Sequence, residues 1–394
     1  MMRILLVSNP HSIHTANWVD GLQQNGVEVD VLFVSDWAKP SKRSTSNLGV
    51  EPLLLDLPSI TSLLFSSLRG LGIANIFRDL RYRTKLHQSL TYLGKLINEI
   101  TLENEYDLIH AHGLADSALL AKASRFYPYT ASAWGSDIYI QPDEYRYIGR
   151  LIRQAIRSAA FVHVESHVSE ARVRSLAADS EIEMFVSTWG VDTSLFQPRS
   201  STDDVESHAK PIRSILSLRA LEPLYRIEQI LHSFAVLAKE YEDIELVVCS
   251  DGSLRSSLVS LADSLGILNR TRFPGYVDEK KKKQLLADAY LYVQCPESDG
   301  VALTMMEAMS SGLPVISTDV GETSVLVDDG VNGILVNGDL PNSLTSALRL
   351  LLEDPNLRDS MGIESRRIVV NKHSRKGFFE RFVATAEAHL KQIS

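Results

Sequence analysis

The first half of the chain alternates short apolar runs with segments in which apolar and polar positions follow a helical pattern. The apolar runs lie at residues 4–7, 29–34, 108–109 and 161–164, and the helix-patterned segments include residues 16–24 and 117–123. Alternation of this kind predicts a parallel β-sheet with helices packed on both faces.

The same alternation begins again after residue 211. Apolar runs at residues 215–218, 245–248, 290–293 and 315–316 alternate with helix-patterned segments at residues 227–238, 254–265 and 280–287. The polar stretch 197–211, flanked by prolines, reads as a linker. The sequence therefore predicts an α/β protein with two doubly wound domains, residues 1–196 and 212–376, followed by a helix at residues 377–394. Because open sheets bind ligands beyond the carboxyl ends of their strands, two such domains facing each other would form a cleft.

Composition narrows the class of protein. The 394 residues are 44% hydrophobic and 23% charged, which suits two globular domains with full cores. The net charge of −9 argues against a general nucleic-acid binder, which needs a basic surface. The only cysteines, Cys249 and Cys295, lie in or beside apolar runs, so we expect a reducing cytosol and no disulfide. No apolar run is long enough for a signal peptide or a membrane span.

The stretch from residue 296 to residue 316 carries two acidic side chains at a suggestive spacing. Asp299 lies in a loop after an apolar run, and Glu307 lies in a helix-forming segment, residues 303–311, that Gly312 and Pro314 end. The N-terminus of such a helix attracts anions such as a diphosphate. One of the two carboxylates could then bind one end of a ligand, and the other carboxylate could bind the opposite end of the same ligand. The alternative is an ordinary surface loop and core helix.

The residues of this stretch resemble the donor-binding signature of the retaining family 4 glycosyltransferases of the GT-B fold, which reads roughly E-G-F-G-L-x-x-x-E-A-M-A-x-G-x-P-V-I. Asp299 stands where the family usually has its first glutamate. The matching residues are Glu307, Ala308, Met309, Gly312, Pro314, Val315 and Ile316. Weaker matches, in the family's order and spacing, lie at residues 189–198, 249–252, 275–277 and 321–322.

The resemblance implies two Rossmann-like domains and a retaining hexosyltransferase. It would move a hexose of the glucose type from a UDP-sugar to a saccharide or lipid-linked saccharide in polysaccharide or glycolipid biosynthesis. A sugar-nucleotide epimerase of the same fold and a catalytically silent scaffold are the alternatives. Asp299 is expected to hold the transferred sugar and Glu307 the ribose, while Arg219 and Arg226 neutralise the diphosphate. The remaining donor-binding candidates are Val301, Ala302, Leu303, Thr304, Val277, Gly275, Asp251 and Gly252. We expect no cofactor and no metal, since no metal-binding cluster stands near these residues.

Candidates in the first domain are less specific. His14, after the first strand, could contact sugar or phosphate, or simply cap a helix. His110 and His112 alternate with apolar residues, so they are expected to share one face of the sheet on the acceptor side; a metal site is the weaker alternative. Trp134 stands where the family often has a histidine near the sugar, and Asp137 is either a catalytic base or a turn-stabilising aspartate.

Residues 61–100 combine apolar side chains with a local excess of basic residues, six against two acids. Amphipathic basic surfaces bind anionic lipid head groups, which predicts peripheral association with the inner face of a membrane. The alternative is a pair of ordinary helices with solvated arginines.

Overall fold

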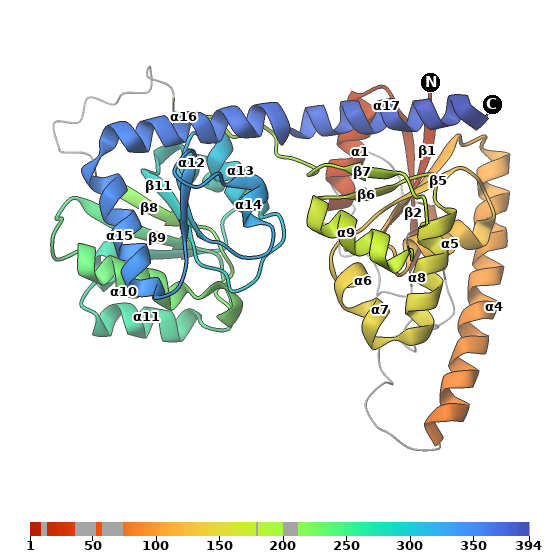
Figure 1. Cartoon of the computed structure of the whole chain (residues 1–394), viewed down its shortest axis with the longest axis horizontal. Helices are drawn as coiled ribbons and strands as arrows, with labels where there is room; N and C mark the ends of the chain where they lie inside the picture. The colour runs from red at the N-terminus through yellow and green to blue at the C-terminus, as the bar shows by residue number, and fades with distance from the viewer. Residues whose placement is uncertain (9–13, 36–52, 57–73, 179, 200–211, 394) are drawn as a thin grey trace. The chain divides into compact units, whose positions relative to one another are not determined.

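The computed structural model describes residues 1–8, 14–35, 53–56, 74–178, 180–199 and 212–393, without the side chains of residues 14, 34–35, 53–56, 74–82 and 85. Packing divides the chain into two compact units (Figure 1). The first consists of Met1–Thr188 with Phe379–Ser394, and the second is Trp189–Phe378. The segment 189–196, which the sequence analysis assigned to the first domain, therefore packs with the second unit. Most of the predicted linker, residues 200–211, lies outside the described residues.

The first unit is a parallel α/β sheet. Its elements are β1 (Arg3–Ser8), α1 (His14–Gln24), β2 (Glu28–Ser35), β3 (Leu53–Asp56), α4 (Ala74–Glu103), β4 (Leu108–His112), α5 (Ser117–Ser124), β5 (Tyr129–Ser132), α6 (Ser136–Tyr139), α7 (Gln141–Glu144), α8 (Arg146–Ser158), β6 (Val162–Val164), α9 (His167–Leu176) and β7 (Met184–Val186). Within the described ranges the seven strands lie in the order β3-β2-β1-β4-β5-β6-β7, and every neighbouring pair is parallel.

Alternation along β4 shows how the two faces of this sheet differ. Ile109 and Ala111 belong to the apolar core that also contains residues of α4, α5 and α8. His110 and His112 point to the other face, where both contact Trp18 of α1. The last helix, α17 (Arg375–Ile393), packs Phe382 against the same tryptophan at a ring distance of 5.1 Å. The predicted common face of the two histidines is confirmed.

The second unit repeats the architecture. Its elements are β8 (Arg213–Ser217), η2 (Pro223–Tyr225), α10 (Ile227–Leu237), β9 (Ile244–Cys249), α11 (Arg255–Ser264), η3 (Leu268–Arg270), β10 (Thr271–Gly275), α12 (Glu279–Asp288), β11 (Leu291–Gln294), α13 (Leu303–Ser310), β12 (Val315–Thr318), α14 (Thr323–Leu326), β13 (Gly333–Val336), α15 (Leu340–Glu353) and α16 (Pro355–Lys372). The six strands found in the described part lie parallel in the order β10-β9-β8-β11-β12-β13.

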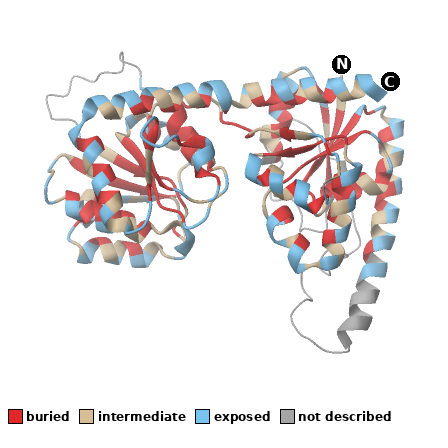
Figure 2. Ribbon diagram, viewed as in Figure 1, coloured by how far each residue is buried: buried red, intermediate tan, exposed pale blue. Residues whose placement is uncertain are grey.

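Apolar residues cover both faces of the second sheet. Ile215 belongs to one core cluster and its neighbour Leu216 to another, as expected when side chains alternate along a strand that is buried on both sides. Figure 2 shows the same distribution, with buried residues concentrated along the strands of each unit. The prediction of two doubly wound α/β domains is confirmed, and the predicted strands and helices lie within a few residues of the observed ones.

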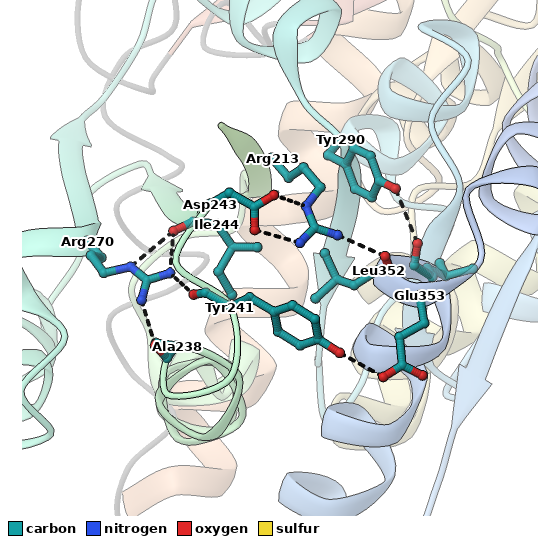
Figure 3. Close-up of polar contacts among 10 residues, drawn as sticks. Arg213, Ala238, Tyr241, Asp243, Ile244, Arg270, Tyr290, Leu352 and Glu353 are labelled. Carbon is teal, nitrogen blue, oxygen red and sulfur yellow. Dashed lines mark hydrogen bonds and ion pairs between the residues drawn. The ribbon is translucent and has the colours of Figure 1, made fainter. Parts of the chain in front are cut away.

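The amino ends of β8 and β9 are joined by charged hydrogen bonds (Figure 3). Arg213 donates through Nε and Nη2 to the two carboxylate oxygens of Asp243, at 3.1 and 2.7 Å, and through Nη1 to the carbonyl of Leu352 at 2.8 Å. Arg270 donates to the carbonyls of Ala238 and Ile244. These contacts secure the edge of the sheet opposite to the carboxyl ends of the strands, where ligands bind in this architecture.

The predicted membrane surface at residues 61–100 falls largely outside the described residues, since residues 57–73 and several side chains of α4 are not described. Arg83 and Lys95 are described, and the guanidinium of Arg83 lies over the ring of Tyr147. Among the described helices, none combines the length and apolar character required to cross a bilayer.

Candidate functional site

The second sheet reverses its strand order between β8 and β11, which lie side by side at its centre. In open α/β sheets this switch point is where ligands bind, beyond the carboxyl ends of the strands. Arg219 follows β8 by two residues, and Asp299 lies in the loop between β11 and α13. The sheet order therefore brings together two side chains that are far apart in the sequence.

Arg219 and Asp299 form a buried ion pair. The Nη2 of Arg219 lies 2.8 Å from Oδ2 of Asp299, and the two side chains are only 10% and 14% exposed. The guanidinium also lies 4.3 Å from the ring centroid of Tyr225, and its Nη1 is 3.4 Å from the hydroxyl of Thr304 on α13. Burial raises the pKa of Asp299, and the nearby positive charge of Arg219 opposes that shift.

A glycine fixes the loop that carries Asp299. Gly321 has a φ of +55°, and a Cβ atom at this position would lie 1.8 Å from the carbonyl oxygen of Asp299. The same carbonyl accepts a hydrogen bond from the N–H of Glu322 at 3.3 Å. Residues 321–322, one of the weaker family matches, thus pack against the backbone of the loop that carries Asp299. Any side chain at position 321 would displace that loop.

Glu307 lies near the middle of α13 and is almost fully buried, with 3% of its surface exposed. Its Oε1 accepts from Nζ of Lys282 on α12 at 2.5 Å, whereas its buried Oε2 has no hydrogen-bond partner among the described residues. Burial raises the pKa of Glu307, and Lys282 opposes the shift. A buried acceptor without a partner costs free energy, which is the arrangement expected where a ligand hydroxyl would bind.

The start of α13 is suited to an anion. Ala302 precedes the helix, and its carbonyl accepts from the N–H groups of Met305 and Met306. The N–H groups of the first helical residues, Leu303 and Thr304, have no intrahelical acceptor in an α-helix, and they carry the positive end of the helix dipole. Val301, Leu303 and Thr304 are half-buried, so this turn is accessible in part.

Arg226 makes different contacts from those expected. Its Nε donates to the carbonyl of Cys295 at 2.9 Å and its Nη2 donates to the carbonyl of Pro296 at 2.6 Å. Arg226 itself has a φ of +46° and precedes α10. Within the described part of the chain, Arg226 therefore ties the start of α10 to the end of β11. Its guanidinium does not join the ion pair of Arg219 and Asp299.

The other donor-binding candidates lie on loops after neighbouring strands. The N–H of Ser250 donates to the carbonyl of Gly275 at 2.8 Å, so the loop after β9 contacts the end of β10. The N–H of Leu221 donates to the carbonyl of Asp251, and a Cβ atom on Gly252 would lie 2.5 Å from the carbonyl oxygen of Leu221. Ser250, in the weak family match at residues 249–252, has a positive φ of 102°.

Val277, the residue expected to meet the base, is half-buried and packs against the apolar cluster that includes Met305 and Met306 of α13. Its position beyond β10 places it on the same edge of the sheet as the other loops. The loops after β8, β9, β10 and β11 therefore all lie at the carboxyl edge, as the sequence analysis predicted for a donor site.

His110, the first of the two predicted histidines of the first unit, is a core residue. His110 is fully buried and stacks on Trp18 at a ring distance of 4.3 Å. Its Nδ1 lies 2.8 Å from the hydroxyl of Thr130 and its Nε2 lies 3.1 Å from that of Ser132. Burial lowers the pKa of His110 far below its ordinary value, so this histidine is neutral. Such a side chain organises the core and is not presented to an acceptor.

His112 is 5% exposed and lies at the carboxyl end of β4, beside β1. Its Nδ1 is 3.2 Å from the hydroxyl of Ser8, and its ring meets that of Trp134 edge-on at 5.2 Å. Trp134 is only half-buried. His112 and Trp134 therefore lie together at the switch point of the first sheet, and they remain candidates for the acceptor side.

Asp137 has the contacts of a turn-stabilising residue, the alternative given by the sequence. Its Oδ1 accepts from the N–H of Trp134 and its Oδ2 accepts from the N–H of Leu114, both at 2.9 Å. It is 4% exposed, and burial raises its pKa to about 6. With both oxygens bound to the backbone, it is poorly placed to act as a catalytic base. His14 begins α1, and its side chain lies outside the described residues.

A third buried histidine, His163 on β6, was missed by the sequence analysis because a lone histidine in an apolar strand gives no distinct signal. Its Nδ1 lies 2.9 Å from the hydroxyl of Ser132 and its Nε2 lies 2.7 Å from the carbonyl of Ser187. Burial lowers the pKa of His163 to about 4. Ser132 of β5 thus links His110 of β4 to His163 of β6, the strands on either side of it.

The low pKa of His163 predicts that acid weakens the first unit. Between pH 7 and 5 the unfolded chain takes up a proton at the ordinary histidine pKa near 6.5, whereas the folded unit does so only near 4. Stability from this residue is therefore lost as the pH falls, by about 2 kcal/mol at pH 5. Urea unfolding at the two pH values should show a smaller loss in a His163→Gln variant, while His167→Gln, at an exposed site, should behave like wild type. Equal losses in all three proteins would contradict this account.

Two further site residues were also missed. Tyr225 stacks on the guanidinium of Arg219, and Lys282 binds Glu307. Tyr225 ends η2, which is too short to give a regular sequence pattern. Lys282 belongs to a run of four lysines that reads as a solvated helix face, so only the packing of α12 against α13 distinguishes it. No group of three or more His, Cys, Asp or Glu side chains suited to a metal ion occurs among the described residues.

Comparisons with known proteins show which family this chain resembles. Residues 200–368 match the family model described as "Glycosyl transferases group 1", and residues 3–167 match the model described as "Glycosyl transferase 4-like". The chain is 21% identical to an uncharacterized glycosyltransferase of Methanocaldococcus jannaschii, over 92% of this chain and 90% of that protein. It is 24% identical to the alpha-D-kanosaminyltransferase of Streptomyces kanamyceticus over only 38% of each chain.

Among solved structures, the chain is similar to HepE of Anabaena in complex with UDP. The TM-score is 0.73 with 17% sequence identity, and the match covers 98% of this chain and 100% of that one. The same protein has also been solved in complex with UDP-glucose. At this level of identity the likeness concerns the fold, which is the two-domain α/β fold described above.

Proposed function

The chain belongs to the group 1 glycosyltransferases of the family 4 type, which have the GT-B fold, and on this premise we propose that it transfers a hexose of the glucose type from a UDP-sugar with retention of configuration. The acceptor would be a saccharide or a lipid-linked saccharide in polysaccharide or glycolipid biosynthesis. The donor would bind to the second unit, at the carboxyl ends of β8 and β11.

The observation that carries this proposal is the buried Arg219 and Asp299 pair beside the first turn of α13. A buried ion pair adds little to stability, because the cost of removing two charges from water offsets their attraction. Its presence at the switch point of the sheet is better explained by ligand binding. Glu307 supports the same reading, because its buried Oε2 has no partner among the described residues.

Each group of the donor has a complementary partner in this arrangement. Arg219 and the free N–H groups at the start of α13 would neutralise the diphosphate, including the charge that grows on the leaving oxygen. Glu307 would accept hydrogen bonds from the ribose hydroxyls, and the backbone at Val277 would meet the base. Asp299 would hold hydroxyls of the transferred sugar and stabilise the developing oxocarbenium ion.

The assignment of UDP rests on similarity of fold, because HepE of Anabaena has been solved with UDP and with UDP-glucose. We further propose that no metal ion is required, since Arg219 and the α13 N-terminus supply positive charge at the diphosphate. As no described side chain near Asp299 is evidently a covalent nucleophile, the proposed reaction is front-face substitution, in which the leaving phosphate helps to deprotonate the acceptor.

The test is incubation of the protein with a panel of UDP- and GDP-sugars, with and without saccharide and lipid-linked acceptors, while nucleoside diphosphate release is measured. We expect release of UDP that depends on an acceptor and persists in EDTA. A new sugar nucleotide formed without acceptor would indicate an epimerase instead. Binding of UDP without any turnover across the panel would indicate a catalytically silent scaffold.

A further inference from the structure

Lys282 differs from the other lysines in its run. Lys280, Lys281 and Lys283 are exposed on α12, whereas the side chain of Lys282 is 22% exposed and turns toward α13. Its Nζ lies 2.5 Å from Oε1 of Glu307 and 5.2 Å from the ring centroid of Phe196. Orienting an ammonium group inward gives up most of its hydration, so the contact with the buried carboxylate must compensate for that loss.

The contact leaves the two oxygens of Glu307 in different environments. Oε1 is taken by Lys282, and Oε2 is buried and has no partner among the described residues. A carboxylate oxygen can accept more than one hydrogen bond, so Oε2 alone could receive both hydroxyls of a vicinal diol. The other charged groups that act on Glu307 are Glu279 on the same helix as Lys282 and Arg375 at the start of α17.

We propose that Lys282 is a positioning residue for donor binding: by holding Oε1 of Glu307, it directs Oε2 toward the ribose hydroxyls and so sets the affinity of the site for ribonucleotides. This inference rests on the proposed function, in which Glu307 binds the ribose. It adds to that function a residue on a different helix that acts only through Glu307. Lys282 is not assigned any contact with the diphosphate.

The test compares Lys282→Met with Lys283→Met, a matched change at an exposed neighbour, by calorimetric titration with uridine, UDP and 2′,3′-dideoxy-UDP at pH 7.5. Lys282→Met should weaken the binding of uridine and of UDP by the same factor, roughly tenfold, because charge-assisted hydrogen bonds are the interactions lost. The dideoxy nucleotide should bind both variants and wild type about equally. Lys283→Met should match wild type with all three ligands.

A pH series provides a readout that a purely structural role would not change. Without the ammonium group, the buried Glu307 carboxyl takes up a proton at higher pH than in wild type. The affinity of Lys282→Met for uridine should therefore fall from pH 8 to 6 more steeply than that of the wild-type protein. If the Met variant does not fold, as judged by circular dichroism, Lys282→Gln serves in its place, because it keeps a polar group near Glu307 without the charge.

Several outcomes would overturn the inference. A Lys282 variant that binds all three ligands like Lys283→Met would remove the positioning role, and a loss for UDP but not for uridine would show that Lys282 acts on the phosphates. A Glu307→Ala variant tells these failures apart from failure of the proposed function. If Glu307→Ala weakens the binding of uridine and UDP, the proposed function stands whatever the result for Lys282. If the wild-type protein does not bind UDP, the proposed function itself fails.

Discussion

Replacement of Asp299 by asparagine is expected to lower the turnover number for sugar transfer by at least about a hundredfold, while the affinity for UDP changes by less than about threefold. Asparagine has nearly the same shape as aspartate but no charge, so the loop and its contact with Glu322 should persist. What is lost is the negative charge proposed to stabilise the developing oxocarbenium ion. UDP, which lacks the sugar, does not need that charge.

The measurement is steady-state transfer with the donor and acceptor found in the panel assay, together with calorimetric titration of UDP. Glu297→Gln is the matched control, because Glu297 is an exposed acid on the same loop. It should retain nearly full turnover. An Asp299→Asn enzyme with unimpaired turnover would remove the proposed role of this carboxylate.

Replacement of Arg219 by methionine is expected to weaken UDP binding by about ten- to a hundredfold and to lower transfer further still. One charge-assisted contact with a phosphate contributes roughly 1.5 to 3 kcal/mol, which corresponds to that range. The change also leaves Asp299 without its cationic partner. Arg219→Lys should be intermediate, because an ammonium keeps the charge but loses the planar fork that binds two oxygens at once.

Titration with uridine, UMP and UDP shows whether the loss arises at the phosphates. The affinity of Arg219→Met for uridine should equal that of wild type, and the loss of affinity relative to wild type should be largest for UDP. Arg272→Met, which removes an arginine from an exposed ion pair with Glu245 on the same sheet, is the control and should bind all three ligands normally. A uniform loss for all three ligands in Arg219→Met would instead indicate a damaged fold.

Local sequence patterns were sufficient for much of this description. The strands at residues 4–7 and 29–34 and the helix at residues 303–311 were predicted because periodicity and helix-ending residues such as Gly312 are properties of short segments. The positive φ of 77° at Gly312, and the end of α13 at Ser310, agree with that reading. The placement of the candidate donor loops at one edge of the second sheet likewise followed from the order of strands.

Side-chain partners were predicted less well, because they depend on contacts between distant segments. The sequence treated Arg219 and Arg226 alike, yet Arg219 binds Asp299 and Arg226 binds two backbone carbonyls at the end of β11. It left Asp137 between base and turn, and the two backbone N–H groups that bind its carboxylate favour the turn.

The sequence alone determined that the chain forms two doubly wound α/β domains and that residues 296–316 carry the acidic pair, because alternation and motif spacing are written in neighbouring residues. Only the tertiary structure decided which cations meet those acids. The sheet order places β8 beside β11, so Arg219 reaches Asp299, and the packing of α12 against α13 selects Lys282 from four adjacent lysines. Burial sets how strongly these groups interact. Where water is excluded, the attraction within an ion pair is stronger and an acceptor oxygen without a partner costs more free energy.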